Sequence, residues 1–374
     1  MDESWGGGLQ VELLPARQGD AILVSWTAGA RPHRMLIDAG PSHAYDAVQA
    51  RMREIVPDGP LDLLVLTHVD ADHVEGTILL VNDASLGLEI GEVCHNSSKH
   101  LTDELAPVHG EILGRIVEKR GIPWNDRFAG RAVGAPGDGP LPVRTLPGGL
   151  RLTVLGPSPS ALRGLRDVWL RACSAANLDV DSEDDALAAL AARPKLSPLD
   201  SYLGGGVPDP RRLAESRTGA DRSETNASSI VLLVEYGDTR VLLAGDATPA
   251  ELLPAVRRLL AERGADRLPL SAFKLPHHGS QNNIDAELVV LLPAERYLFS
   301  SDGSQFGHPD DEAVGTVVMN APAGAELVFN YENDRTARWA DDELCGRYGY
   351  SARYPETAGA GVRTMLGGPA GAGR

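Results

Sequence analysis

Two histidines and two aspartates fall within six consecutive positions of the stretch "LTHVDADHVEG", residues 66–76. They are His68, Asp70, Asp72 and His73, and they follow the apolar run "LDLLVL", which is typical of a buried strand. Imidazole nitrogens and carboxylate oxygens are the ligands that Zn²⁺, Mn²⁺ and related cations take from proteins. The stretch therefore predicts a metal centre. From spacing alone, the alternative is a solvated acidic loop.

Other polar side chains that can bind metals also follow apolar strands. Asp246 ends "VLLAGD", the pair His277 and His278 follows "FKLP", and His308 follows "YLFSS" in the run "SSDGSQFGHP". Asp38 ends the strand "RMLID" in the same way. Because strand ends are rigid, side chains placed there can converge without the entropy cost of ordering a loop. We therefore expect these residues to meet at one site.

The elements that must position these residues alternate between strand and helix. Period-two or continuous apolar runs predict strands at 9–15, 21–26, 34–38, 61–66, 88–96, 151–157, 270–276, 295–301 and 325–334. Helical spacing predicts helices at 42–56, 73–82, 100–120 and 310–321. The stretch 228–246 predicts a β-hairpin with the turn Gly237–Asp238. Thr248, Pro249 and Glu251 then predict a helix start with a capping box.

We expect a single domain over residues 1–355 with an insertion at about 157–225. That segment is irregular, and helical patterns at 160–176 and 182–192 lead into a Gly- and Pro-rich loop. Residues 356–374 are Gly/Ala-rich, and we expect a disordered tail there.

The composition limits the function further. The formal net charge of -17 argues against sequence-independent binding of nucleic acid by basic residues, although a nuclease with bound cations stays possible. The start of the chain has no signal-peptide pattern, no apolar run is long enough to cross a membrane, and three widely spaced cysteines form no disulfide framework. We expect a cytoplasmic protein without a membrane partner.

Six motifs occur in an order that resembles the metallo-β-lactamase superfamily. They are "QGDAIL", "LIDAG", "LTHVDADH", "NASSIVLLVEYGDTRVLLAGD", "LPHHGS" and "FGHP". Within the superfamily, the likeness is to the soluble hydrolase domain of ComEC-type DNA-uptake proteins, and it covers residues from about 9 to about 320 apart from insertions. The resemblance implies an α/β fold, a four-layer αββα sandwich, with one or two divalent metal ions at one edge of the sheets.

The resemblance also implies a ligand set. By motif position, His68 and Asp70 would bind the first metal and Asp72 and His73 the second. Asp246 would bridge the two, and His278 is favoured over His277 as the remaining ligand.

The sequence departs from the superfamily pattern at two points. Asp70 stands where the common pattern has histidine, and a carboxylate there favours harder ions, so that Mn²⁺ joins Zn²⁺ as a candidate. No histidine is a clear match for the middle motif. His95 comes early and fits a core position better, and His100 and His109 have the spacing of helix-surface residues.

The implied chemistry is hydrolysis by a metal-activated water. His277 would donate a proton, and Asp72 would act in catalysis as well as in metal binding. Ser280, Asn226 and His308 are expected to bind substrate. Capping of the strand is an equal alternative for Asn226, and His308 could instead be a further metal ligand or support another ligand. Asp20 and Asp38 are expected to fix turns or orient ligands.

Three functions fit this reading. The leading one is hydrolysis of a phosphodiester in nucleic acid, a nucleotide or a phospho-headgroup, which Asp70 and "HHGS" favour. The second is hydrolysis of a carboxylic ester, lactone or β-lactam. The third is a non-catalytic, metal-stabilised module whose acidic surface or 157–225 insertion binds a protein partner.

Overall fold

Two β-sheets form the centre of the molecule in the computed structural model, which describes residues 8–29, 31–97, 108–166, 206–216 and 219–367. The first sheet has the strand order β14-β1-β2-β3-β4-β5. Its strands are β1 (Leu9–Leu13), β2 (Ile22–Ala28), β3 (Arg31–Ile37), β4 (Leu63–Val65), β5 (Val93–Cys94) and β14 (Val362–Leu366). Because β3, β4 and β5 run parallel, their carboxyl ends share one edge of the sheet.

The second sheet has the order β13-β12-β11-β10-β9-β8-β7-β6. Its strands are β6 (Val143–Thr145), β7 (Arg151–Gly156), β8 (Val231–Tyr236), β9 (Thr239–Leu243), β10 (Ala272–Lys274), β11 (Arg296–Phe299), β12 (Ala325–Phe329) and β13 (Tyr350–Arg353). β8 and β9 form the predicted hairpin. From β9 to β13 all neighbours are parallel, so their carboxyl ends also line up.

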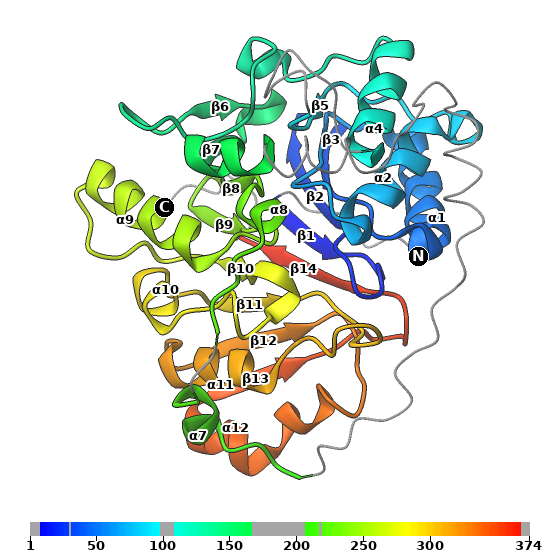
Figure 1. The fold of residues 1–374 in the computed structure, drawn as a ribbon. Coiled ribbons are helices and arrows are strands. Elements are labelled where there is room, and N and C mark those ends of the chain that lie inside the picture. Colours follow the sequence, from blue (N-terminus) through cyan, green and yellow to red (C-terminus); the bar gives the residue numbers. More distant parts are fainter. Residues whose placement is uncertain (1–7, 30, 98–107, 167–205, 217–218, 368–374) are drawn as a thin grey trace.

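Helices cover the outer face of each sheet. The helices of the described residues include α1 (Tyr45–Ile55), α2 (Ala71–Asn82), α4 (Val108–Lys119), α7 (Pro210–Ala214), α8 (Glu224–Ala227), α9 (Pro249–Arg263), α10 (Ala286–Leu291), α11 (Asp311–Asn320) and α12 (Asp342–Tyr348). Figure 1 shows α1, α2 and α4 beyond the first sheet and α9, α10 and α11 beyond the second. Successive side chains of β9 point to opposite faces of the sheet, which explains the layers. Val241 and Leu243 face the other sheet, whereas Leu242 packs against the helices. The structure thus confirms the predicted four-layer αββα sandwich.

Several predictions need correction. The tail after residue 355 is not disordered throughout, because Val362–Leu366 form β14 and pair antiparallel with β1. Their burial alternates, so that one face of β14 joins the core, and β14 becomes the edge strand of the first sheet. The strand predicted at 88–96 is reduced to β5.

The predicted helix start at Pro249 is confirmed, but its capping box is not. The Thr248 side chain makes no capping hydrogen bond, and the Glu251 carboxylate instead accepts from the Ser158 backbone N–H at 3.2 Å. The two helices predicted at 160–176 and 182–192 fall largely outside the described residues, as does the first part of the 100–120 helix.

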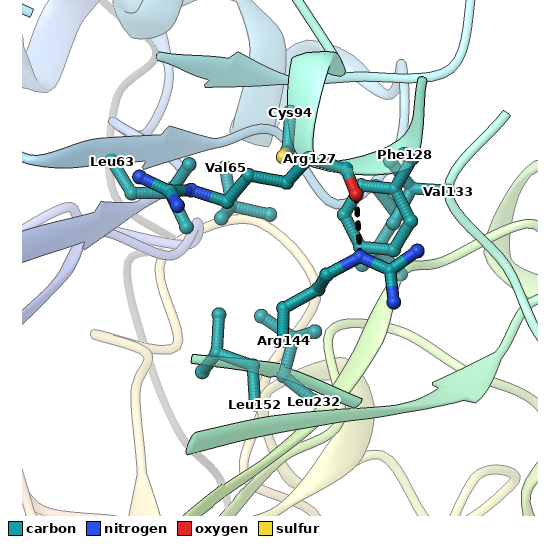
Figure 2. A pocket seen from close by; sticks show the side chains of 10 residues that line it. Leu63, Val65, Cys94, Arg127, Phe128, Val133, Arg144, Leu152 and Leu232 are labelled. Atoms are coloured by element: carbon teal, nitrogen blue, oxygen red, sulfur yellow. Dashed lines mark hydrogen bonds between the residues drawn. The ribbon is translucent and has the colours of Figure 1, made fainter. Parts of the chain in front are cut away.

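One small cavity lies between the sheets, and Figure 2 shows its lining. Its volume is about 10 Å³, and it is lined mainly by apolar side chains such as Val65, Cys94, Phe128 and Leu152. Because about one water-sized sphere fills that volume, it is not a substrate pocket.

Among the described residues, no helix combines the length and the apolar character that crossing a membrane requires.

Candidate metal centre

Potential metal ligands from both sheets meet around the carboxylate of Asp246. Asp246 follows β9, and its Oδ2 lies 3.3 Å from His73 Nε2, in the first turn of α2. The same oxygen lies 3.5 Å from Nε2 of His278, which follows β10, and 3.8 Å from Nε2 of His68, which follows β4. His278 Nε2 also lies 3.7 Å from Asp72 Oδ2. The aligned strand ends therefore bring together residues that are up to 210 positions apart in sequence (278 − 68 = 210).

The donor atoms fit a divalent cation. Nε2 of His68, His73 and His278 and Oδ1 of Asp246 are buried and have no hydrogen-bond partner among the described residues. Such a group of polar atoms is costly to bury unless something binds it. Two atoms that bind one ion at about 2.1 Å with tetrahedral geometry lie about 3.4 Å apart, close to the spacing found here. The cluster thus has both the chemistry and the spacing of a metal site.

The opposite nitrogens of His68 and His73 are held by a buried network. Asp38 ends β3 in the left-handed region, at φ 56, and accepts from the Thr67 N–H and hydroxyl, both at 2.7 Å. Asp38 Oδ2 also lies 2.8 Å from His73 Nδ1. Because the Thr67 hydroxyl donates to Asp38, it accepts from His68 Nδ1 at 3.1 Å. Both rings therefore carry their proton on Nδ1 and present the Nε2 lone pair to the cluster.

His278 has a separate buried support. Its Nδ1 lies 3.2 Å from Asp20 Oδ1 and 3.1 Å from the Ser300 carbonyl oxygen. The Lys274 ammonium donates to Asp20 Oδ2 at 2.8 Å, and neither side chain is more than 1% exposed. Burial alone would raise the pKa of Asp20, but the charges of Lys274 and His278 outweigh it and hold that pKa well below its usual range. As expected, Asp20 and Asp38 both orient an imidazole.

The negative charges of the cluster favour the binding of cations. Burial lowers the pKa of His278, but the charges of Asp246 and Asp20 outweigh it and raise that pKa to about 9. The pKa of His73 is also raised, because Asp246 and Asp38 outweigh the effect of burial. Without metal, the carboxylates thus attract protons to the imidazoles. A bound cation replaces these protons, so metal uptake releases them.

Three groups of residues could each hold a metal ion, because the potential ligand atoms within each group lie within 4.8 Å of one another. Together they include five of the six predicted metal ligands. The groups are His68–His73–Asp246, Asp72–His73–His278 and Asp20–Asp246–His278. Asp70 is outside these groups. Its Oδ2 lies 3.6 Å from His68 Nε2 and accepts from the Thr225 hydroxyl at 3.2 Å.

His277 lies at the exposed side of the same cluster. Its side chain is 25% exposed, and its Nε2 lies 3.7 Å from Asp246 Oδ2. Its Nδ1 lies 2.9 Å from Asn283 Oδ1 and 3.6 Å from Asp221 Oδ2. Burial lowers the pKa of His277, but Asp246 and Asp221 outweigh it and raise that pKa. The ring of His308, with its centroid 5.3 Å away, extends this side of the site.

Two other predicted substrate-binding residues are held by the protein itself. Asn226 donates from Nδ2 to Asp221 Oδ2 at 2.7 Å, and its buried Oδ1 has no partner among the described residues. The Ser280 hydroxyl accepts from the Asn282 N–H at 3.3 Å, within the turn after Gly279. Asn226 thus keeps an acceptor for a bound molecule, whereas Ser280 first serves the turn.

The described residues supply no histidine for the middle motif. The buried ring of His95 stacks on Trp124, with centroids 6.1 Å apart, and is in none of the three ligand groups. His100 and the side chain of His109 lie outside the described residues.

Asp221, Asn283 and Lys274 are site residues that the sequence analysis missed. Lys274 had a signal, since a lone lysine inside the apolar run "AFKLP" must be paired if the strand is buried. Asp221 and Asn283 belong to loops whose motifs carry no comparable signal.

Comparisons with known proteins add no function to this description. No protein-family model and no curated protein matches the chain. Similar solved structures include a metallo-β-lactamase with a HARLDQ motif from Cronobacter sakazakii, with 13% identity, 84% of this chain and 92% of that chain covered, and a TM-score of 0.31. A metal-soaked Flv1 flavodiiron core from Synechocystis has 11% identity, 90% and 83% coverage and a TM-score of 0.27. The four-layer assignment rests on the sheet order and core described above.

Proposed function

We propose that this protein is a metal-dependent hydrolase that cleaves a phosphodiester at the cluster around Asp246. The observation that carries the proposal is the convergence of three buried, unpartnered imidazole Nε2 atoms on that carboxylate. The residues that would hold one or two Zn²⁺ or Mn²⁺ ions are His68, Asp72, His73, Asp246 and His278, with Asp70 next to His68. A bound divalent cation supplies a more acidic water and polarises a phosphoryl oxygen.

The proton transfers of the reaction are carried out by side chains of the protein. The Asp72 carboxylate takes the proton that the attacking water loses as its oxygen bonds to phosphorus. His277 gives a proton from Nε2 to the leaving oxygen as the old P–O bond breaks, because this nitrogen faces the cluster from the exposed side.

One feature favours a phosphodiester over a carboxylic ester. The site is rich in carboxylates, with Asp70, Asp72 and Asp246 around it, which suits hard ions such as Mn²⁺ that also bind phosphoryl oxygens.

The test is metal quantification of the purified protein together with turnover of bis-p-nitrophenyl phosphate under Zn²⁺ and under Mn²⁺. We expect bound metal and metal-dependent release of p-nitrophenol. Turnover of p-nitrophenyl acetate or a chromogenic β-lactam in place of the phosphodiester would support the ester alternative. Bound metal with no turnover of any of these substrates would support the non-catalytic module.

A further inference from the structure

The loop between β11 and α11 carries an exposed aromatic side chain beside the cluster. Among the aromatic side chains that the structure describes, Phe306 is the one that is mostly exposed, at 54%. Its ring centroid lies 6.2 Å from that of His308, which in turn lies 5.3 Å from that of His277. Since His277 borders the cluster, Phe306 is the second ring outward from it.

Hydrogen bonds to a distant segment hold the loop that carries Phe306. Gln18, which is only 4% exposed, donates from Nε2 to Gln305 Oε1 at 2.9 Å. The Asp302 N–H donates to the Arg17 carbonyl oxygen at 3.0 Å. The fold therefore fixes the position of the ring, and a molecule that binds there does not have to order the loop first.

The exposure of Phe306 alone would carry little, because single exposed apolar side chains are ordinary on protein surfaces. Phe306 differs in two respects from the other exposed large apolar side chains, which are Val143, Val207 and Met365. It is aromatic, and it lies beside the candidate site on an anchored loop. A flat ring that is exposed and held in place can stack on a planar group of a bound molecule.

Positive charge beside Phe306 favours an anionic ligand. The Arg335 guanidinium packs against the backbone of the loop, because a Cβ added to Gly307 would lie 3.1 Å from its Nη2. Arg17, whose side chain is 47% exposed, lies 3.4 Å from Asp302 in the same loop. Aromatic rings also bind quaternary ammonium groups, but two guanidinium groups nearby would repel such a cation. One ring next to guanidinium groups thus favours a base joined to phosphate over a choline headgroup.

We propose that Phe306 is a specificity-determining residue that stacks on a nucleobase, so that the phosphodiester cleaved at the cluster joins two nucleosides. This inference rests on the proposed function and narrows its substrate class. Stacking uses the flat face of a base and does not read its edge, so we expect little preference among the four bases.

The test compares two ligands that differ only in their bases. One is the dinucleotide of thymidine, and the other is its abasic counterpart, in which hydrogen replaces both thymines. Binding to the metal-loaded protein is measured by calorimetry with phosphinate analogues of both, in which CH₂ replaces the bridging oxygens so that neither bond can be hydrolysed. Hydrolysis of the two esters is followed separately by mass spectrometry.

In the wild-type protein we expect the thymidine analogue to bind about 10-fold more tightly than the abasic one, as is typical of one base stacked on an aromatic ring. We expect kcat/KM for the two esters to differ by a similar factor. Phe306→Ala should remove both differences, whereas Phe306→Tyr keeps an aromatic face and should retain them.

Val207→Ala is the matched control, because Val207 is 62% exposed and takes part in none of the contacts above. It should leave both differences unchanged. Since Phe306 is mostly exposed, Phe306→Ala should fold and keep its metal. Urea unfolding and metal content of the variants check this directly.

Equal binding of the two analogues by the wild-type protein, or no binding of either, would overturn the proposal, as would a preference that Phe306→Ala leaves intact. Faster hydrolysis of glycerophosphocholine than of the dinucleotide would also overturn it. If the wild-type protein hydrolysed no phosphodiester but bound the thymidine analogue through Phe306, the proposed function would fail and the stacking role would stand. Hydrolysis of both esters at equal rates would leave the proposed function in place and remove the stacking role.

Discussion

His277 and His278 are neighbours in sequence with similar backbone conformations, yet their side chains differ in burial and in hydrogen-bond partners. Both lie in the left-handed region, at φ 49 and φ 57. The side chain of His278 is completely buried, and its Nδ1 meets the deeply buried Asp20. The side chain of His277 is 25% exposed, and its Nδ1 meets Asn283 at the rim of the site.

This difference shows how one residue type can serve two purposes at adjacent positions. His278 is supported by the buried ion pair of Lys274 and Asp20, whose carboxylate contacts Nδ1. This contact orients the ring so that Nε2 faces the cluster. The support of His277 is a set of neutral amides and one partly exposed carboxylate, open to a substrate and to solvent. We therefore propose metal binding for His278 and proton transfer for His277.

The largest expected effect comes from removing each ring in turn. His278→Ala should lower bound metal and abolish turnover, because it deletes a ligand atom from the cluster. His277→Ala should retain the metal and lower kcat by about 10²- to 10⁴-fold for a phosphodiester with an alkoxide leaving group, such as a dinucleotide, which is the range typical of a positioned acid. Metal content and turnover, measured side by side, test the assignment. Equal metal loss in both variants would mean that both rings are ligands and that His308 is the next candidate for proton donor.

The supports of the two rings should differ in stability. Lys274→Met leaves the buried Asp20 carboxylate without its cation and should cost about 3–5 kcal/mol in the free energy of unfolding. Asp221→Ala removes hydrogen bonds at the rim and should cost at most about 2 kcal/mol. Urea unfolding of both metal-free proteins gives the two values. The contrast between the two sides would be wrong if Asp221→Ala cost more.

The buried side should also dominate the pH dependence of the metal-free protein. The pKa of folded His278 is raised to about 9, above its unfolded value near 6.5. The stabilisation by its charged form is therefore complete below about pH 6.5 and is lost as pH rises through about 9. Asp20 and Asp246 have lowered pKa values and do not titrate in this window.

Thermal unfolding of the chelator-treated protein should accordingly show a midpoint that falls across this range. The fall should be smaller after metal is added, because the cation replaces the proton. A midpoint that rises with pH in the metal-free protein would contradict the environment described for His278.

The smallest effect is expected at Asp70, which lies beside the cluster rather than within the ligand groups. Asp70→His replaces an oxygen donor with a nitrogen donor and should shift the preference from Mn²⁺ towards Zn²⁺. The ratio of activities with the two ions measures the shift. If the ratio stays constant, Asp70 is not a ligand.

The sequence predicted the features that depend on short-range patterns. The apolar runs before Asp38, His68, Asp246 and the histidine pair located the strand ends, whereas the αββα sandwich was implied by the resemblance of the six motifs to the metallo-β-lactamase superfamily. The positioning of the rings could not be predicted, because it depends on contacts between distant segments. Asp20 lies 258 positions from His278, and Asp221 lies 56 positions from His277 (277 − 221 = 56). β14 was missed because its pairing with β1 joins the two ends of the chain.

The most direct test of a metal-dependent hydrolase centred on Asp246 is the isosteric substitution Asp246→Asn. Metal content and turnover of bis-p-nitrophenyl phosphate should be measured together. The control is Asp209→Asn, because Asp209 caps α7 and asparagine caps a helix equally well. We predict at least one transition-metal ion per chain in the wild-type protein and the control. We predict loss of both metal and turnover in Asp246→Asn, since the carboxylate nearest three imidazoles would lose its charge. Unchanged metal content with full activity in Asp246→Asn would contradict this account.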